Sequence, residues 1–255
     1  MSNLNDVNIV ILAAGHGKRM QSELPKVLVP LHGRPLITHV LESIKNSGIN
    51  TTPVVVVGQH KELVMQALGD NYKYAIQEEQ LGTGHAVMSA RTALPSNTKH
   101  VMVLYGDHPF ISSETIRQLV EKHLSSSSKI TMATVKLADF EDWRSVFYSN
   151  FGRIVRDESG QISKIVEFKD TKTDEEKNIK EVNPSYFCFD ADWLWDNLKQ
   201  LKTDNAQKEY YLTDLVKIAM QEKIKIESMQ IDPREALGAN SKQELETLER
   251  LLEKM

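Results

Sequence analysis

Two glycines and two cations near the N-terminus are the first residues whose types and spacing could perform chemistry. Gly15 and Gly17 follow an apolar run, where glycines let successive backbone N–H groups turn inward around an anion. Arg19 adds a planar guanidinium, and Lys26 adds a point charge. We therefore predict a phosphate site, although an ordinary turn with solvated cations has the same residue types. The loop lacks the Gly-Lys-Ser/Thr of P-loop enzymes and the third glycine of the dinucleotide fingerprint.

Further polar residues follow other apolar runs. Asp107 comes after the run 101–105, and magnesium commonly takes one or two carboxylate ligands together with substrate phosphates. Gln77 begins a polar, glycine-containing stretch that ends at His85, and its amide is able to pair with the edge of a base. Taken alone, a single aspartate is typical of a turn, and residues 77–85 are typical of a plain loop.

Three segments resemble a known family. Residues 12–20, Leu-Ala-Ala-Gly-His-Gly-Lys-Arg-Met, and residues 24–28, Leu-Pro-Lys-Val-Leu, resemble the signature of the sugar-phosphate nucleotidyltransferases. Residues 77–85 are similar to the uracil-reading segment of N-acetylglucosamine-1-phosphate uridyltransferases. The likeness extends from Ile11 to about Glu249. It implies an enzyme with a Rossmann-like nucleotidyltransferase fold.

The resemblance also implies a site. Arg19 and Lys26 would be the catalytic cations that neutralise charge on the triphosphate, and Asp107 and Asn240 would hold Mg²⁺. The nucleotide would lie against Leu12, Ala13, Ala14, Gly15, Gly17, Gln77, Gly82 and Thr83. The sugar would lie against Tyr105, Gly152, Glu167 and Asn183. Without the resemblance, Asn240 is simply a residue near a helix start, where asparagine is common.

The implied reaction joins UTP and a sugar 1-phosphate, with N-acetylglucosamine 1-phosphate as the first candidate, and releases pyrophosphate. Three departures bear on the sugar: Lys18 replaces a threonine, Asn183-Pro-Ser185 replaces Asn-Thr-Gly, and residues 139–150 exceed the usual loop. The aromatic residues of that loop either form a lid or interface or pack down. Three alternatives stay open: a uridylyltransferase for another sugar, a cytidylyltransferase, and a nucleotide-sugar-binding protein without activity. Because the sequence ends before any hexapeptide repeat, we expect no acetyltransferase activity.

The composition limits the remaining classes. The 255 residues carry a formal charge of −4, so nothing attracts nucleic acid or an anionic membrane to the chain as a whole. Cys188 is the single cysteine, which fits a reducing compartment. We find neither a signal peptide nor an apolar stretch of about 20 residues. We expect a cytoplasmic protein without nucleic-acid or membrane partners; its oligomeric state stays open.

Alternating strands and helices must position these residues. Apolar runs predict strands at 7–13, 54–57, 74–77 and 101–105, and helical spacing predicts helices at 35–47 and 63–68. This alternation indicates one α/β domain with a mostly parallel sheet, whose ligands lie beyond the carboxyl ends of the strands. We expect a nucleotide-binding half at about 1–124 and a serine connector at 125–128. A hairpin-rich sugar-binding half should follow at about 129–240, with strands at 152–156, 161–168 and 186–189, and a final helix at 241–255 with Ser241 and Glu244 in capping-box spacing.

Overall fold

A computed structural model of the chain describes residues 3–15, 17, 20, 22–126 and 128–253. The strands in this part are β1 (Val7–Leu12), β2 (Pro30–Leu31), β3 (Arg34–Pro35), β4 (Val54–Val57), β5 (Lys73–Ile76), β6 (His100–Tyr105), β7 (Ile130–Lys136), β8 (Gly152–Arg156), β9 (Ile162–Val166), β10 (Glu181–Asn183), β11 (Phe187–Asp190) and β12 (Ile226–Gln230). The helices are α1 (Leu36–Asn46), α2 (Lys61–Leu68), α3 (Thr83–Ala90), α4 (Ser113–Ser126), α5 (Val146–Asn150), α6 (Asp174–Lys177), α7 (Ala191–Leu198), α8 (Asp214–Gln221) and α9 (Lys242–Leu252).

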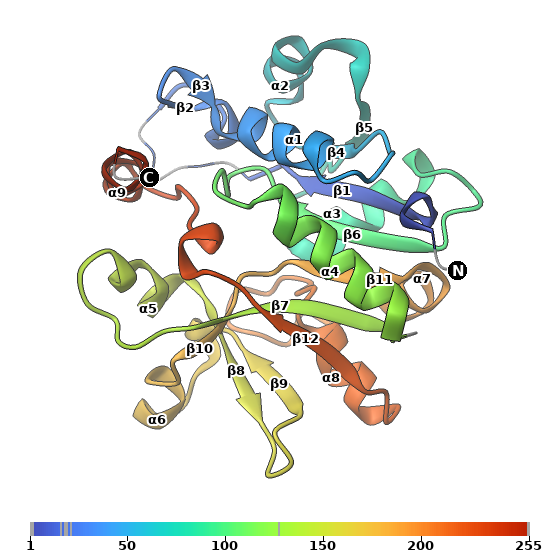
Figure 1. The fold of residues 1–255 in the computed structure, drawn as a ribbon, viewed down its shortest axis with the longest axis vertical. Coiled ribbons are helices and arrows are strands. Elements are labelled where there is room, and N and C mark those ends of the chain that lie inside the picture. Colours follow the sequence, from blue (N-terminus) through green and yellow to red (C-terminus); the bar gives the residue numbers. More distant parts are fainter. Residues whose placement is uncertain (1–2, 16, 18–19, 21, 127, 254–255) are drawn as a thin grey trace.

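One mixed sheet runs through the described part of the chain (Figure 1). Its strand order is β5-β4-β1-β6-β11-β7-β10-β8-β9, and β12 pairs with β7. The first four strands are parallel, so their carboxyl ends lie at one edge of the sheet. This confirms the predicted Rossmann-like α/β architecture. The strands and helices predicted in the first 105 residues are also present, each within one or two residues of the expected bounds.

The second half extends the same sheet. β11 runs antiparallel between β6 and β7, and the predicted hairpin of β8 and β9 turns at Gly160, whose φ of +79° suits glycine. One expectation was wrong, because Ser125 and Ser126 do not belong to a connector but form the last residues of α4, a helix that was not predicted. Besides its hairpin, this half also contains α7 and α8.

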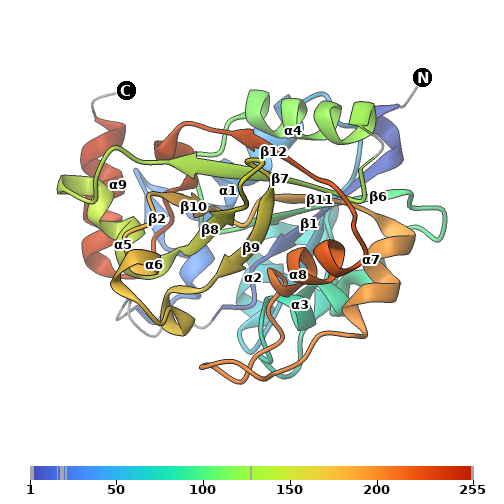
Figure 2. The same ribbon diagram turned by 90° about the horizontal axis from the view of Figure 1, so that it is seen from below.

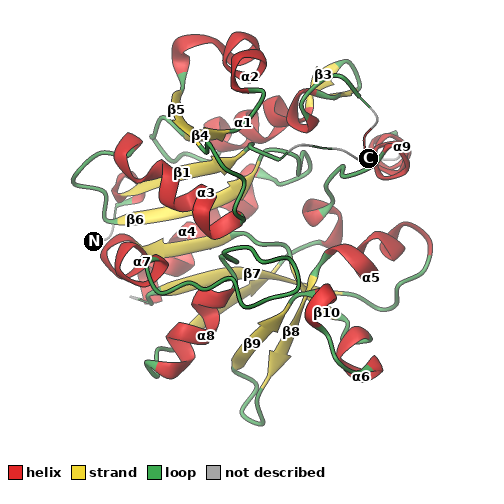
Figure 3. Cartoon of the chain, turned by 180° about the vertical axis from the view of Figure 1, so that it is seen from behind, coloured by secondary structure: helices red, strands yellow, loops and turns green. Residues whose placement is uncertain are grey.

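Helices cover both faces of the sheet. Figure 2 shows α4 on one side, with α3, α7 and α8 on the other, and Figure 3 shows the second group from its own side. Successive residues of β1 alternate between the two resulting cores: Ile9 and Ile11 pack with the α1 and α4 side, whereas Val10 and Leu12 pack with α3, α7 and α8. The sheet is therefore buried on both faces, as its continuous apolar strands predict. None of the described helices is long and apolar enough to cross a membrane.

Residues 139–150 pack against the body of the protein around one buried arginine. Arg153 is 0% exposed, and its guanidinium donates hydrogen bonds to the carbonyl oxygens of Phe147, Tyr148, Phe151 and Lys177. The guanidinium also lies over the rings of Phe140, Tyr148 and Phe168. Four carbonyls and three ring faces replace the water that a buried cation loses. Phe147 of this segment is therefore fully buried, and Phe140 and Trp143 are partly buried, whereas Tyr148 remains 36% exposed.

Buried His123 of α4, which contacts the partly buried His100 of β6, makes stability depend on pH. His123 is 1% exposed, with Nε2 3.1 Å from His100 Nδ1 and Nδ1 3.0 Å from Thr131 Oγ1. Burial lowers the pKa of His123 to about 4, from an unfolded value of 6.5. Because the folded pKa is depressed, the unfolded chain binds more protons below pH 6.5. Stability contributed by neutral His123 is complete above that pH and is lost progressively toward pH 4.

We expect His123→Gln to remove part of this acid sensitivity. Gln keeps hydrogen-bonding capacity but does not take up a proton in this pH range. The free energy of unfolding of the variant should therefore fall less than that of the wild type between pH 7.5 and pH 4.5. The expected difference is about 2 kcal/mol. Urea denaturation of both proteins at the two pH values measures it. The exposed His60→Gln serves as control, and equal pH dependence in all three proteins would contradict the prediction.

Candidate functional site

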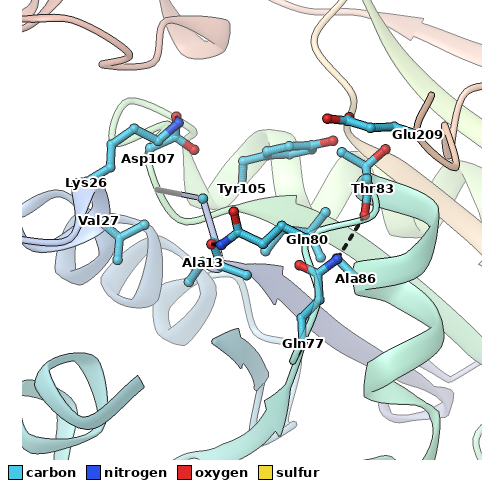
Figure 4. A pocket seen from close by; sticks show the side chains of 14 residues that line it. Ala13, Lys26, Val27, Gln77, Gln80, Thr83, Ala86, Tyr105, Asp107 and Glu209 are labelled. Atoms are coloured by element: carbon cyan, nitrogen blue, oxygen red, sulfur yellow. Dashed lines mark hydrogen bonds and ion pairs between the residues drawn. The ribbon is translucent and has the colours of Figure 1, made fainter. Parts of the chain in front are cut away.

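Two adjoining pockets lie at the carboxyl edge of the parallel strands. The first (Figure 4) is lined by Leu12, Ala13, Ala14, Gly15, Lys26, Val27, Gln77, Gln80, Gly82, Thr83, Ala86, Tyr105, Asp107 and Glu209. The second is lined by Lys26, Thr83, Tyr105, Asp107, His108, Asn150, Phe151, Gly152, Glu167, Asn183, Pro184, Ser185, Gln207, Glu209, Tyr211, Thr213 and Asn240. Five residues line both, and Lys26 and Asp107 are among them. The predicted nucleotide residues and the predicted sugar residues thus line neighbouring pockets, and Asp107, a predicted metal ligand, lines both.

The glycine loop leaves β1 directly into the first pocket. Leu12 to Gly15 line its wall, whereas Gly17 lies outside both linings. Gly17 has a φ of +59°, and a Cβ on it would come within 2.8 Å of Lys26 Cβ. Glycine is therefore required here because the loop and the segment of Lys26 pass in close contact. Arg19, the second predicted cation, and Lys18 beside it lie outside the described residues, so their roles stay predictions.

The amide of Gln77 is held in one orientation. Its Nε2 donates to the carbonyl oxygen of Gly82 at 3.1 Å and lies 3.2 Å from His85 Nδ1. Because a carbonyl oxygen only accepts, the nitrogen must face Gly82. Figure 4 shows the amide oxygen of Gln77 turned away from this bond, toward the pocket. Gln77 therefore presents an acceptor, not a donor, to whatever lies in the first pocket.

The glycines after Gln77 allow a distant segment to cross helix α3. Tyr210 N donates to Leu81 O at 2.7 Å, and Gly84 N donates to Tyr210 O at 2.8 Å. A Cβ on Gly82 would come within 2.7 Å of Tyr210 O, and Gly82 has a φ of +106°. This crossing brings Glu209 into both pockets, and burial raises the pKa of its carboxyl. Glu209 could not be identified from the sequence, because no motif links it to the glycine stretch.

Lys26 bridges the two predicted metal residues. Its Nζ lies 2.6 Å from Asp107 Oδ2 and donates to Asn240 Oδ1 at 2.9 Å. Asp107 is 3% exposed. Burial alone would raise the pKa of Asp107, but the Lys26 ammonium and, to a smaller degree, His108 outweigh it and hold that pKa below its usual value. A carboxylate and an amide oxygen, 133 positions apart in the chain, thus already converge on one cation.

These two oxygens suit a magnesium ion. Magnesium prefers oxygen ligands, needs few from the protein and keeps several waters or substrate oxygens. The Lys26 ammonium is a cation standing between the same two oxygens, which shows that the arrangement accommodates positive charge. Among the described residues, no group of three or more histidine, cysteine, aspartate or glutamate side chains is placed to hold a metal ion.

The predicted sugar residues line the second pocket together. Glu167 Oε1 accepts a hydrogen bond from Thr213 Oγ1 at 2.9 Å, and burial raises the pKa of the Glu167 carboxyl. Gly152 lies directly over it, since a Cβ there would be 3.2 Å from Glu167 Oε1. Burial also raises the pKa of Tyr105, which lies between the hydroxyls of Ser185 and Thr83. Thr213 was not singled out from the sequence, and only the tertiary structure brings it to Glu167.

Residues 183–185, which differ from the family pattern, form a tight turn at the wall of the second pocket. Asn183 Oδ1 accepts from Ser185 N at 2.9 Å, and Asn183 Nδ2 donates to Ser185 Oγ at 3.1 Å. Ser185 has a φ of +64°, a region that favours glycine. The usual glycine of the family pattern suits this backbone, and in this chain the Asn183 side chain supports serine instead. The turn adds the Ser185 hydroxyl to the lining of the second pocket.

Comparison with known proteins agrees with this geometry. The family model for the MobA-like NTP transferase domain matches residues 9–213. The bifunctional protein GlmU of Desulfotalea psychrophila is 39% identical over 248 residues, which cover 96% of this chain and 70% of that protein. GlmU of Caldanaerobacter subterraneus subsp. tengcongensis is 43% identical over 243 residues, covering 95% of this chain but 51% of its own length.

A solved structure shares the fold. The crystal structure of UDP-glucose pyrophosphorylase complexed with UDP-glucose superposes with a TM-score of 0.76 at 18% identity. The superposition covers 97% of this chain and 98% of that one. At this identity the likeness concerns the arrangement of strands and helices, which here extends over nearly the whole chain.

Proposed function

Since the chain belongs to the MobA-like NTP transferase family and is a nucleotidyltransferase, we propose that it transfers a uridylyl group from UTP to a sugar 1-phosphate. The membership confirms the resemblance to sugar-phosphate nucleotidyltransferases, whereas the base and the sugar belong to the proposal. The observation that supports uridine is the orientation of Gln77. Its Nε2 is committed to Gly82 O, which leaves an acceptor facing the pocket.

At the N3 position of the base, the oxygen of Gln77 distinguishes uracil from cytosine. Uracil carries an N–H donor at N3, whereas cytosine carries an unprotonated acceptor at the same position. An oxygen of Gln77 would hydrogen-bond the first and repel the second. A rotated amide could serve cytosine, but rotation would place its oxygen against Gly82 O and break the 3.1 Å bond. A site that hydrogen-bonds one donor of its ligand strongly rejects analogues without that donor, because the polar group of the site is then left unpaired.

Mg²⁺ would be held by Asp107 and Asn240 and would neutralise charge on the phosphates of both substrates. The Lys26 ammonium, released from these oxygens, would reach the triphosphate, and we assign Arg19 the same function. The backbone amides of Gly15 and its neighbours would hold the phosphate chain.

No general base is required for the transfer. A sugar phosphate is largely a dianion at neutral pH, because its second pKa is about 6. One of its oxygens would form a bond to the α-phosphorus of UTP while the bond to pyrophosphate breaks. The chain's contribution is to bring the two anions together and to stabilise the charge that develops. The position of Lys26 and Asp107 in both pockets suits this task, because the reacting phosphorus must lie where nucleotide and sugar meet.

The sugar substrate is expected to be a hexose 1-phosphate with an acetamido or hydroxyl substituent, and N-acetylglucosamine 1-phosphate is the first candidate. Glu167 and Asn183 provide an acceptor and an amide for such groups. The chain spans 70% of one GlmU relative and about half of others, so activities of the whole relatives are not assigned to it.

Pyrophosphate release tests the proposal. The protein is incubated with Mg²⁺, a panel of sugar 1-phosphates and each of UTP, CTP, ATP, GTP and dTTP. We expect release with UTP, and a rate with CTP below about 1% of that value. Gln77→Leu, which cannot accept a hydrogen bond, should lower kcat/KM for UTP. Faster turnover with CTP than with UTP would reject the base assignment, and no turnover with any pair would reject the reaction.

A further inference from the structure

A carboxylate on the last helix holds the side chain of Asn240. Glu244 Oε2 accepts hydrogen bonds from Asn240 N at 2.8 Å and from Asn240 Nδ2 at 3.0 Å. The nitrogen of the Asn240 amide must face this carboxylate, because a carboxylate oxygen accepts and does not donate. Oδ1 of the same amide therefore points the other way, where it meets Lys26 Nζ at 2.9 Å. The orientation of the oxygen predicted to bind a cation thus depends on Glu244.

Glu244 is itself fixed from two sides. Its backbone N–H donates to the Ser241 Oγ cap at 3.2 Å, and its Oε1 accepts from Asn150 Nδ2 at 3.1 Å. Asn150 ends α5, so its hydrogen bond to Glu244 links α5 to α9 although 91 residues of sequence lie between the two helices. Ser241 and Glu244 have capping-box spacing, but their hydrogen bonds differ from the usual capping box. The Glu244 carboxylate accepts from the N–H of Asn240 instead of the N–H of Ser241.

We propose that Glu244 is a positioning residue for the metal site and that Asn150 holds it in place. The proposal rests on the proposed function, since it takes Asn240 as a metal ligand. An amide that loses its partner can turn over and present its NH₂ group to the cation, which would repel it. Groups that orient metal ligands in this way typically contribute about 10- to 100-fold to metal affinity. The segment 139–150 thus contributes to the metal site through Asn150 without touching the metal.

The test is Mn²⁺ affinity of the full chain without substrates, measured from the electron paramagnetic resonance signal of free Mn²⁺. Glu244→Leu should weaken binding about 10-fold or more, and Asn150→Ala should weaken it less. Glu244→Gln should stay near wild type, because Gln keeps one oxygen for Asn240 while the Asn150 amide turns over to accept from its nitrogen. The exposed Glu246→Leu on the same helix is the matched control and should bind normally.

The outcomes separate this inference from the proposed function. If Asn240→Ala binds Mn²⁺ as tightly as wild type, the metal assignment itself fails. If Asn240→Ala weakens binding while Glu244→Leu and Asn150→Ala do not, only the positioning role is rejected. Weakening by Glu244→Gln as large as that by Glu244→Leu would show that charge matters and orientation does not, which also rejects the role. Thermal unfolding checks that each variant is folded. If Glu244→Leu does not fold, Asn150→Ala still tests the positioning role, because it leaves α9 unchanged.

Discussion

Asp107→Ala is expected to lower kcat/KM about 10³-fold while the protein remains folded. Asp107 is the charged oxygen ligand of the proposed metal site, and it is one of the five residues that line both pockets. Its removal takes away a metal ligand and also the partner of Lys26, 2.6 Å away. Pyrophosphate release from UTP and the sugar 1-phosphate measures the effect. Mn²⁺ affinity measured in parallel should fall with it.

Two variants make this result interpretable. Asp107→Asn keeps the shape and one neutral oxygen, so it should lose most of the activity through charge alone. Asp196→Asn, at an exposed surface pair with Lys199, removes a carboxylate away from the site and should be fully active. Thermal unfolding of all three should show that Asp107→Ala is folded, because Lys26 keeps Asn240 as a partner and remains 15% exposed to water. Wild-type rates in Asp107→Ala would exclude it from the site.

Lys26→Met is the second variant expected to have a large effect, a loss of about 10²- to 10³-fold in kcat. Met has a similar length and packs well but carries no charge for the leaving pyrophosphate. Unlike Asp107→Ala, this variant should not weaken Mn²⁺ binding, since the competing ammonium between Asp107 and Asn240 is gone. Metal affinity equal to or above wild type, together with a low kcat, separates the function of Lys26 from that of the metal ligands.

Lys26→Arg and Lys45→Met complete the experiment. Arg keeps the charge but has a planar fork in place of a compact ammonium, so partial recovery of kcat is expected. Lys45 is exposed near the end of α1, and its replacement should leave kcat unchanged. An active Lys26→Met would show that Lys26 only stabilises the metal-free site.

Part of the architecture could be predicted because local patterns carry it. Apolar runs such as 54–57 specify a buried strand, and the spacing of Ile37, Val40, Leu41 and Ile44 specifies the buried face of α1. Helix α4 also had such a pattern, with Ile116, Leu119 and Val120 buried on one face, but the serines at its end suggested a connector. Helix α2 was also predicted, although the apolar side chain of Leu63 in it is exposed. The pairing of β11 between β6 and β7 has no local signal, because residues far apart in sequence form it.

The sequence by itself determined the type of chemistry. The glycine loop, Gln77 and Asp107 follow the ends of β1, β5 and β6, and a parallel sheet brings such ends together. The tertiary structure decided how these groups are oriented. The Gly82 carbonyl turns the oxygen of Gln77 into the pocket, Lys26 joins Asp107 to Asn240, and Glu244 sets the amide of Asn240. Orientation depends on hydrogen-bond partners that only folding brings within reach, so spacing along the chain could identify the groups but not the directions in which they point.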